Sequence, residues 1–562
     1  MTKKRNYDNW SKEELIREVI KLEKRKKYGV VWEDKLEEVA TLCKEKLPIL
    51  EEEVKKEIKT DSEKPVNILI EGDNYHALSV LNYTHKGKID VIYIDPPYNT
   101  GAKDWKYNNH YVDSNDQWRH SKWLSFMDKR LRLAKKLLKK NGVFICTIDH
   151  NEQEALGLLL QEIFPGKNIV CVTIVHNPAG IQGDNFSYCH EYAYFVFSKG
   201  GRYIGHQIRN ENEADIRNFR DVTGDDSLRT AAANCFYPIY VKNGEIIGFG
   251  DVCRNDFHPG KVNIIKNNGV IEVYPVDPQD VERKWRFARQ TVKGVKDELK
   301  AKYINKRKVW DIVRIKNRFN YKTVWNDSRY SSNNHGTQLL NQIVERNAFS
   351  YPKSIYAVID SIDAASKNNN EAIILDFFAG SGTTGHAILE MNKDDGGKRK
   401  FILCTNNENK IAEDICYPRI KNVINGYIGR ISSKRIKGLA GNLKYFKTAF
   451  VDANPTDKNK KRLVDKSTEM LCLKEDCFDE VKKGEDFRIF KNSQNKYLGI
   501  IYDDKGIEGF KKEAKKMKEK FVVYVFSLDE SAREEEFEDM ADMVQLKPIP
   551  AVILNVYKRI FK

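Results

Sequence analysis

The sequence lacks the features of a membrane, secreted or metal-binding protein. No uninterrupted apolar run reaches about 18 residues, the length that a transmembrane helix needs. The first residues, MTKKRNYDNW, lack the apolar core of a secretion signal. The ten cysteines form no CxxC pair, and the two closest are Cys472 and Cys477. This spacing argues against a disulfide framework or a zinc site and favours reduced thiols. We expect a cytoplasmic protein with no metal site and no membrane partner.

A GxxxxGK[ST] run, which would bind a nucleoside triphosphate, is also missing, so any ATP-driven step would need another subunit. Positive charge is abundant: the net charge at pH 7 is +15, the pI is about 9.0, and charged residues make up 31%. Such a balance favours a polyanionic partner, nucleic acid above all, although many lysine-rich soluble proteins share it. At 562 residues the chain should hold more than one domain.

The most informative stretch is Ile89–Gly101, IDVIYIDPPYNTG. Its β-branched and aromatic residues predict a buried parallel strand over 89–94. The tetrapeptide DPPY (95–98) ends this strand, because prolines fix the backbone and lack N–H groups. In open α/β sheets, ligands bind at the carboxyl ends of strands. An acid, exposed carbonyls and an aromatic ring at such an end suit a flat ligand that carries an amino group. A plain proline turn would explain only the prolines.

A neighbouring strand is predicted over 66–70, followed by EGDN and a helix over about 75–83. Strand, helix and strand in this spacing form a βαβ unit, so both strand ends should open on one edge of the sheet. This places Asp73 near Asp95. Asp73 alone would more often cap the helix, and the proximity of Asp95 leaves both a capping role and a ligand role open.

The other elements around this unit follow from hydrophobic periodicity. A helical arm is predicted for residues 1–60, with a helix that Ser11 caps and a second, charged helix over about 33–59. Later elements are a helix over about 117–140, a strand over 143–149, a helix over 152–163 and strands over 169–175 and 190–198. The last strand, HEYAYFVFS, suits an edge or antiparallel position, and we interpret His190 as structural and not as a catalytic base.

Between about residues 200 and 330 the composition changes. Buried strands become hard to find, and basic and aromatic residues intermingle, as in WRFARQ, KRKVW and RIKNRFNYK. Basic side chains hold phosphates and aromatic rings stack on bases. This composition predicts a substrate-reading insertion, with a lysine-rich surface domain without a ligand as the alternative.

A second ligand-binding pattern lies in residues 371–390, EAIILDFFAGSGTTGHAILE. AIIL predicts a buried strand ending at Asp376, and Gly380-Ser381-Gly382 predicts the turn into a helix, where small residues and unpaired N–H groups let a ligand approach. With Gly385 the run satisfies GxGxxG, and Glu408 follows the next strand, where an acid is placed to hold ribose hydroxyls. Alone, the pattern fits a dinucleotide as well as another adenosine-bearing cofactor.

DPPY together with Phe378, Gly380, Gly382 and an acid one strand later resembles the S-adenosylmethionine-dependent amino-methyltransferases of DNA. DPPY decides against a dinucleotide enzyme. Its place ahead of the glycine turn, with a variable region between, resembles the β class. The stretches YGVVWEDK, EGDNYHAL, DPPYNTG and YPKS are similar to Mod subunits of type III restriction–modification systems. The resemblance covers about residues 15–430 and, more loosely, the C-terminal part.

The resemblance implies an α/β fold with a mixed, mostly parallel, seven-stranded methyltransferase (Rossmann-like) sheet in permuted motif order. It implies transfer of the methyl group of S-adenosylmethionine to N6 of adenine in a specific DNA sequence. Cytosine-N4 enzymes more often carry Ser where this chain has Asp95, which favours adenine. Asp95 and the Pro96 carbonyl would accept hydrogen bonds from N6, and Tyr98 would stack on the flipped base.

The implied catalytic residues are Asp95, Pro96, Pro97 and Tyr98. The implied cofactor-binding residues are Asp73, Lys353, Asp376, Phe377, Phe378, Ala379, Gly380, Ser381, Gly382, Thr383 and Glu408, of which Lys353 would otherwise be a surface lysine.

We predict five domains: a helical arm (1–60), the catalytic part (61–199), the target-recognition insertion (200–330), the cofactor-binding part (331–438) and a small C-terminal α/β domain (439–562). The expected partners are double-stranded DNA with a flipped adenine, a second copy of the chain, and an ATP-dependent restriction subunit. Three alternatives stay open: a solitary DNA methyltransferase, an RNA amino-methyltransferase, and a catalytically silent DNA-recognition subunit.

Overall fold

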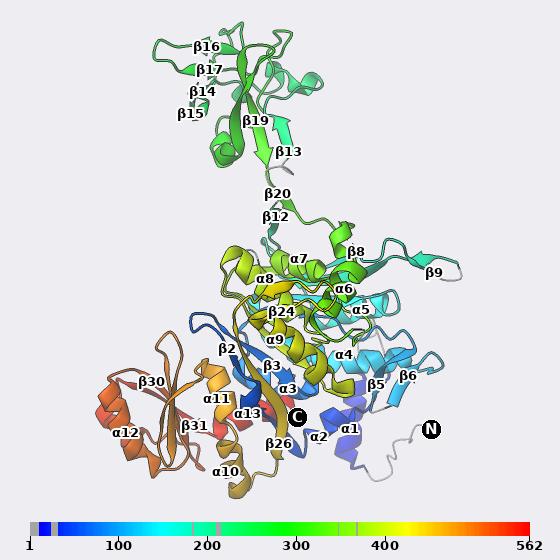
Figure 1. Cartoon of the computed structure of the whole chain (residues 1–562), viewed down its shortest axis with the longest axis vertical. Coiled ribbons are helices and arrows are strands. Elements are labelled where there is room, and N and C mark those ends of the chain that lie inside the picture. Colours follow the sequence, from blue (N-terminus) through cyan, green and yellow to red (C-terminus); the bar gives the residue numbers. More distant parts are fainter. Residues whose placement is uncertain are drawn as a thin grey trace. The chain divides into compact units, whose positions relative to one another are not determined.

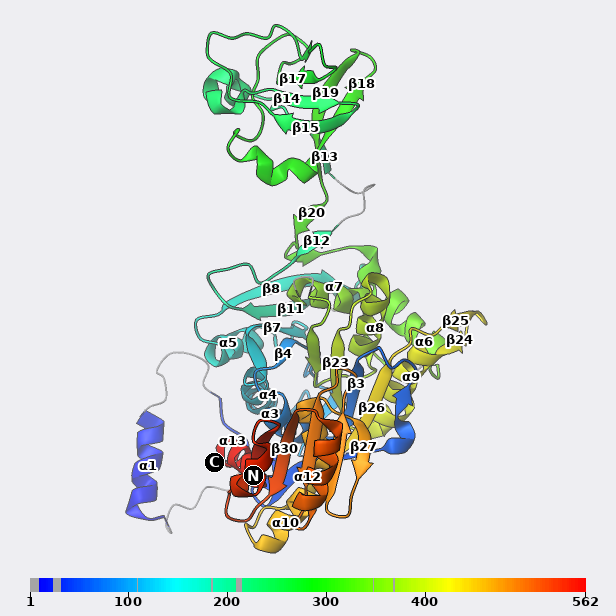
Figure 2. The same cartoon turned by 90° about the vertical axis from the view of Figure 1, so that its left-hand side faces the viewer.

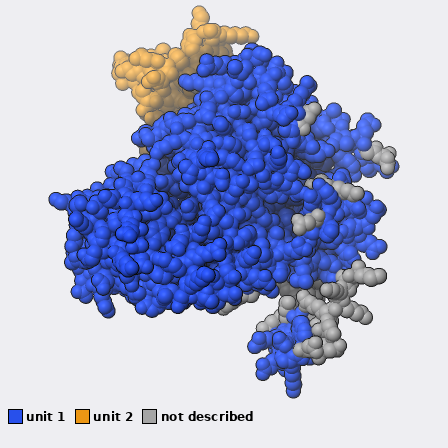
Figure 3. Space-filling model, turned by 60° about the horizontal axis from the view of Figure 1, so that its bottom comes forward, with its two compact units in different colours: residues 1–205, 322–562 blue, residues 206–321 orange. Residues whose placement is uncertain are grey.

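The computed structural model (Figure 1) describes residues 10–23, 32–108, 110–182, 185–208, 215–346, 348–366 and 369–561. They form two compact units (Figure 3). Unit 1 comprises residues 1–205 and 322–562, and unit 2 comprises residues 206–321, close to the insertion expected at 200–330. Among the described residues, no helix is both long enough and apolar enough to cross a membrane.

An eleven-stranded sheet forms the centre of unit 1. Its order is β1 (Lys46–Glu52), β26 (Asn442–Asp452), β3 (Val66–Glu71), β23 (Lys400–Thr405), β22 (Ile373–Asp376), β4 (Ile89–Ile94), β7 (Leu138–Ile148), β11 (His190–Phe197), β8 (Asn168–Val175) and β21 (Val324–Trp325), with β2 (Ile58–Lys59) also on β26. From β26 to β7 all neighbours are parallel, and β11 is antiparallel to both β7 and β8.

The predicted seven-stranded sheet is the central part of this one, from β3 to β8, and the predicted fold class is confirmed. The motif order is permuted, because β22 lies beside β4 in space but follows it in sequence only after the whole of the inserted unit and several further elements. The strands read as continuous apolar runs because helices cover both faces. The helices α3 (Asn74–Thr84), α4 (Arg119–Lys135) and α5 (Gln153–Ile163) pack in one row, and α7 (Ile355–Ser366), α8 (Thr383–Asp395) and α9 (Tyr417–Asn425) pack in a row on the other side (Figure 2).

Two predicted helices are wrong in part. The helix expected over 117–140 ends at Lys135, and Leu138 already begins β7, because it pairs with Ile89 of β4. In the arm, α1 (Lys12–Glu23) begins at the predicted cap Ser11, which forms a reciprocal capping box with Glu14. The second helix is only α2 (Glu38–Leu42), and residues 46–52 form β1, whose apolar run 47–50 is buried against β26. Pairing with a distant strand outweighs local helix propensity in both places.

The C-terminal region contributes β26 to the central sheet, so the boundary predicted at residue 439 lies just before a strand of that sheet. A five-stranded sheet follows: β27 (Asp479–Lys483), β28 (Phe487–Lys491), β29 (Tyr497–Ile501), β30 (Phe521–Phe526) and β31 (Val544–Ile549). Its helices are α10 (Asp457–Asp465), α11 (Thr468–Glu475), α12 (Gly506–Met517), η11 (Glu534–Met540) and α13 (Ala551–Ile560). The predicted strand, helix and strand are β29, α12 and β30, and Asp503-Asp504-Lys505 lies in the turn between the first two, as expected.

Unit 2 is a β-structure with its own core around the buried residues Phe219, Tyr237 and Trp285. The strands that were hard to find in the sequence are short: β13 (Asp215–Asn218), β19 (Val309–Lys316) and β18 (Leu299–Ile304) form one sheet, and β15 (Glu245–Phe249), β14 (Ile239–Lys242), β17 (Ile271–Val273) and β16 (Asn263–Ile265) form another. Its helical turns are η3 (Asp225–Ser227), η4 (Arg229–Ala231), η5 (Ala233–Cys235) and η6 (Val292–Glu298). At the ends of the unit, β12 (His206–Ile208) pairs with β20 (Arg318–Asn320), so the chain enters and leaves side by side.

Shorter elements complete unit 1. They are β5 (Ala102–Tyr107) with β6 (His110–Asp113), β9 (Ile181–Gln182) with β10 (Ser187–Tyr188), β24 (Gly426–Ile428) with β25 (Arg435–Lys437), α6 (Gln338–Ile343), and the turns η1 (Val54–Lys56), η7 (Ser328–Tyr330), η8 (Asn333–Thr337), η9 (Glu408–Lys410) and η10 (Ile411–Cys416).

Candidate active site

The chemistry-bearing residues gather at the carboxyl ends of four adjacent strands. Asp95 follows β4, Asp376 ends β22, Glu408 lies beyond β23, and Asp73 follows β3. Because these strands are parallel neighbours, their ends meet at one edge of the sheet, where α/β proteins bind ligands. The side chain of Asn74 joins the two halves of this edge by donating to the carbonyl of Phe377 at 3.1 Å. The structure thus brings the DPPY strand and the glycine turn together.

Asp95 is half-buried and held on both sides. Its Oδ1 accepts a hydrogen bond from the hydroxyl of Thr147 at 2.6 Å and lies 3.2 Å from the ammonium of Lys353. Burial raises the pKa of Asp95, while Lys353 and the Thr147 hydroxyl act in the opposite direction. The carboxylate is therefore fixed in place as a hydrogen-bond acceptor at the edge of the sheet.

Lys353 is not a surface lysine. Its side chain is 13% exposed, and its ammonium contacts Asp95, Glu191 and the hydroxyl of Tyr98. The ammonium also lies 4.5 Å from the centre of the Tyr98 ring. Burial would lower the pKa of Lys353, but the two carboxylates outweigh it and raise the pKa, so the lysine stays charged. Its predicted role at the methionine end of the cofactor stays a prediction.

Glu191 and Thr147 are site residues that sequence reasoning missed. Glu191 lies on β11, its side chain is 4% exposed, and its Oε2 accepts a hydrogen bond from the Tyr98 hydroxyl at 3.0 Å. The sequence signal for Glu191 is an acid in the aromatic strand HEYAYFVFS, directly after its neighbour His190. That neighbour, His190, has the structural contact expected of it, because its ring nitrogen lies 3.1 Å from the Tyr192 hydroxyl.

The rest of the DPPY turn is held by buried polar groups. The indole of Trp123 donates to the Pro97 carbonyl at 2.7 Å, so this carbonyl has a structural partner. Asn99 is fully buried with a positive φ of 58°; it accepts from the indole of Trp105 at 3.0 Å and donates to Glu152. Since left-handed backbone favours Asn and Gly, Asn99 fixes how the chain leaves the turn.

The side chain of Asp376 holds the glycine turn between β22 and α8 in place. Its carboxylate accepts from the backbone N–H of Phe378 at 2.9 Å and from the Thr384 hydroxyl at 2.6 Å, and burial raises its pKa to about 7. Gly380 and Gly382 have φ values of 49° and 79°. A Cβ on Gly382 would lie 3.1 Å from the sulfur of Cys416, so a side chain there would crowd Cys416 as well as strain the left-handed backbone.

A buried arginine contacts this turn from the protein interior. Arg419 on α9 donates to the hydroxyls of Ser381 at 3.1 Å and Thr383 at 2.8 Å, and burial lowers its pKa to about 10. Ser381 and Thr383 therefore point inward, and only their backbone groups can face a ligand. Phe377 and Ala379 are buried too, and the half-buried Phe378 packs against the ring of Phe126 with centroids 5.8 Å apart.

The two outer predicted residues have structural partners. Asp73 caps α3 by accepting from the N–H of Tyr75 at 2.7 Å, and it also lies 3.4 Å from the buried Arg130. Glu408 pairs with Lys106 of the β5–β6 hairpin. Of the two roles left open for Asp73, the capping role is therefore present, and the ligand role stays a prediction.

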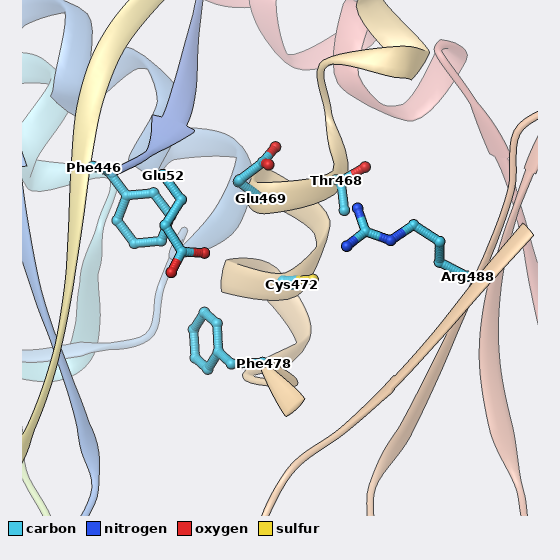
Figure 4. A pocket seen from close by; sticks show the side chains of 7 residues that line it. All are labelled: Glu52, Phe446, Thr468, Glu469, Cys472, Phe478 and Arg488. Carbon is cyan, nitrogen blue, oxygen red and sulfur yellow. The ribbon is translucent and has the colours of Figure 1, made fainter. Parts of the chain in front are cut away.

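The residues around the glycine turn fit an adenosine-bearing cofactor. Neither glycine carries a side chain over its own backbone, although the ring of Phe349 lies close to Gly380. The N-terminus of α8 points into the turn, and acids follow both adjoining strands. A separate pocket lies between the central and C-terminal sheets, with α11 in its wall (Figure 4). It measures about 50 Å³, room for a few water molecules and far less than a nucleoside needs.

Comparisons with known proteins agree with this geometry. A family model named N6_N4_Mtase and described as DNA methylase matches residues 89–431. Type II methyltransferase M.KpnI from Klebsiella pneumoniae is 32% identical over 367 residues, covering 62% of this chain and 82% of that protein. The Mod subunit of the type III enzyme EcoPI from Escherichia phage P1 is 29% identical over 419 residues, covering 66% of this chain and 62% of that protein.

The type III StyLTI Mod subunit from Salmonella typhimurium is 30% identical over 404 residues, covering 66% of this chain and 57% of that protein, so the chain spans less than two thirds of these Mod relatives. Among solved structures, the M1.HpyAVI–SAM complex matches 63% of this chain and 98% of that chain, with 12% identity and a TM-score of 0.29. The predicted resemblance to DNA amino-methyltransferases and Mod subunits is confirmed. With a family match that runs from the first residue of β4 past the end of α9, over more than half of its residues, this chain belongs to the DNA methylase family.

Proposed function

We propose that this chain transfers the methyl group of S-adenosylmethionine to N6 of an adenine flipped out of double-stranded DNA. The observation that carries the proposal is the adjacency of Asp95 and the glycine turn, which follow the neighbouring parallel strands β4 and β22. A hydrogen-bond acceptor for an amino group thus lies beside a glycine turn whose backbone can contact a nucleoside. Family membership supports methyl transfer to DNA, and Asp at the first position of DPPY supports adenine.

The residues around Asp95 have distinct tasks in this proposal. Asp95 and the Pro96 carbonyl accept the two N6 hydrogens, which directs the nitrogen lone pair toward the methyl donor. The Tyr98 ring stacks on the base, and its bond to Glu191 fixes the ring's orientation. The ammonium of Lys353 now donates to Asp95, as the N6 amino group would, so adenine binding moves it toward Glu191, which is already its partner.

The glycine turn and the acids beside it would hold the cofactor. The backbone of residues 378–383 would line the adenosine, Glu408 would accept from the ribose hydroxyls, and Asp73 and Lys353 would lie toward the methionine end. Bound S-adenosylmethionine supplies an electrophilic methyl group on a sulfonium. The chain itself contributes alignment of the nitrogen and exclusion of water, from which most of the rate would come.

We further propose that the chain is the modification and specificity subunit of a restriction system of type III, working as a homodimer with a separate ATP-dependent restriction subunit. The similarity to two Mod subunits supports this assignment. The second candidate is a solitary DNA methyltransferase, which the 82% coverage of M.KpnI favours. The C-terminal five-stranded sheet is the proposed docking surface for a partner.

Modified-base sequencing of DNA from cells that express this chain alone tests the proposal. We expect N6-methyladenine in one short sequence motif, and the strand pattern shows whether one or both strands carry it. The same cells with the Asp95→Ala chain provide the control. N4-methylcytosine would contradict the adenine assignment. Unmodified DNA alongside methylated RNA would favour an RNA substrate.

Unit 2 is the proposed reader of the DNA sequence. Residues 293–318 hold ten Lys or Arg and three Asp or Glu, which concentrates positive charge on η6, β18 and β19. The paired strands β18 and β19 form a basic ribbon, and Lys302, Lys306 and Lys308 are exposed on β18 and in the turn that joins it to β19. The DNA major groove admits a two-stranded ribbon, and basic side chains along it neutralise phosphates.

Replacing Lys302, Lys306 and Lys308 together with Gln should weaken DNA binding and its dependence on salt. Each lost phosphate contact lowers the slope of log K against log[salt] by about 0.9, so the slope should fall by roughly two to three. Filter-binding or fluorescence titrations of DNA at salt concentrations between about 50 and 200 mM measure this slope. The matched control replaces three exposed lysines of the C-terminal domain, Lys512, Lys516 and Lys520. An equal change in both triple variants would remove the ribbon from the DNA-binding surface.

A further inference from the structure

A small hairpin with exposed apolar side chains projects from the candidate active site. Residues 176–189 join β8 to β11, and within them β9 pairs with β10. Ile181 is 62% exposed and Phe186 is 79% exposed. Figure 1 shows β9 reaching beyond the helices of unit 1. A phenylalanine so exposed has no folding role in the described contacts, and the hairpin sequence contains no Lys or Arg that would make it a phosphate-binding loop.

The base of this hairpin is fixed to the site. Its last residue is followed by His190 and Glu191, and Glu191 binds the Tyr98 hydroxyl. Tyr188 stacks flat on His150, with ring centroids 3.9 Å apart and planes 7° apart, and His150 follows β7, the strand beside β4. The hairpin leaves the sheet at the edge where β4 ends, because β8 is parallel to β4 through β7 and β11. Its apolar side chains are thus held at the edge that carries Asp95.

DNA chemistry supplies a matching partner. A base can reach Asp95 only after leaving the duplex, which costs unpairing and unstacking and leaves a gap in the base stack. Proteins that open a duplex insert Phe, Leu or Ile side chains between bases, because a flat apolar group regains part of the lost stacking. The hairpin offers such a group beside the candidate active site without basic residues of its own.

We propose that the described parts of this hairpin, residues 176–182 and 185–189, form a wedge that enters the DNA duplex, and that Phe186 stacks in the place vacated by the flipped adenine, against the unpaired base opposite. The proposal rests on the proposed function. The chain from the hairpin into β11 then has two roles. Glu191 supports the Tyr98 ring that receives the base, and Phe186, five residues earlier, keeps the duplex open.

Phe186→Ala tests the wedge on duplexes that contain the motif found by sequencing. The variant should methylate a fully paired duplex about tenfold more slowly than the wild type, and approach the wild-type rate when the target adenine is mispaired, because the duplex then opens at little cost. Fluorescence of 2-aminopurine at the target position should rise on binding of the wild type and less on binding of the variant. Phe186→Leu, which keeps an apolar wedge, should restore most of the rate on paired DNA.

The control is Val54→Ala, which removes another exposed apolar side chain, 67% exposed, next to β1 at the other end of the sheet. It should leave both rates unchanged. Equal loss for Phe186→Ala on paired and mispaired DNA would overturn the wedge, as would a change from dimer to monomer in size-exclusion chromatography, which would assign the hairpin to a second copy. Absence of N6-methyladenine with the wild-type chain on either duplex would instead refute the proposed function.

Discussion

Replacing Asp95 with Ala should remove nearly all methyl transfer and leave DNA binding nearly intact. The carboxylate is the proposed acceptor for the N6 amino group, and Thr147 and Lys353 hold it at 2.6 and 3.2 Å. Removing one preorganised group that stabilises the charge developing in the transition state lowers the rate about 10²–10³-fold. DNA affinity comes mainly from phosphate contacts elsewhere, so it should change by no more than about threefold. Transfer of labelled methyl groups to motif-containing duplexes measures the rate.

Asp149 provides a matched control for this experiment. It follows β7, the strand beside β4, and its carboxylate bonds to Asn151 and not to Lys353 or Tyr98. Asp149→Ala removes a half-buried carboxylate of the same sheet edge and should retain methyl transfer. If Asp95→Ala stays active, Asp95 does not orient the amino group. If both variants lose DNA binding as well, the effect is one on folding and says nothing of the mechanism.

Removing unit 2 should eliminate sequence preference. Ile208 and Arg318 are direct partners in the β12–β20 pair, so a two-residue Asn-Gly turn can join them in place of residues 209–317. Unit 1 keeps its complete sheet and both halves of the candidate site. Specific DNA binding typically exceeds non-specific binding by about 10³-fold or more, and this difference should disappear. Competition between motif and scrambled duplexes measures it.

The shortened chain needs proof that it is folded. Binding of S-adenosylmethionine, followed by calorimetry, should match that of the full chain within about threefold, because all proposed cofactor residues lie in unit 1. Weak methylation of random DNA would then be the expected residual activity. Unchanged preference for the original motif would move the sequence reader into unit 1 and contradict the role proposed for the basic ribbon.

Short-range patterns in the sequence predicted the parts of the site that depend on local structure. The strand 89–94 and the turns after it and after Asp376 lie where the apolar runs, prolines and glycines place them. Each pattern is confined to a few neighbouring residues and has one favourable backbone solution. The shared sheet edge of Asp73 and Asp95 followed from the handedness of a βαβ unit, but the predicted closeness of the two acids was wrong, because β22 and β23 lie between the strands that they follow.

What the sequence could not show depends on distant pairing. Leu138 leaves a helical pattern because Ile89 offers a strand partner, and residues 46–52 form a strand because β26 runs beside them. Glu191 joins the site only because β11 inserts between β7 and β8, which brings its side chain to Tyr98 and Lys353. A lone acid in an aromatic strand carries no local signal of its partners.

The strand order of unit 1 has a consequence for synthesis of the chain. The neighbours of β3 are β23 and β26, which begin at Lys400 and Asn442, and β22, one neighbour of β4, begins at Ile373. At ribosomal rates of about 5–20 residues per second, the edges of β3 and of β4 wait for tens of seconds before their partners emerge. Exposed apolar edges of this kind pair with other chains. Correct folding of this protein should therefore depend on chaperones that shield nascent chains. Overexpression should yield aggregates of chains that associated before their second half had been made.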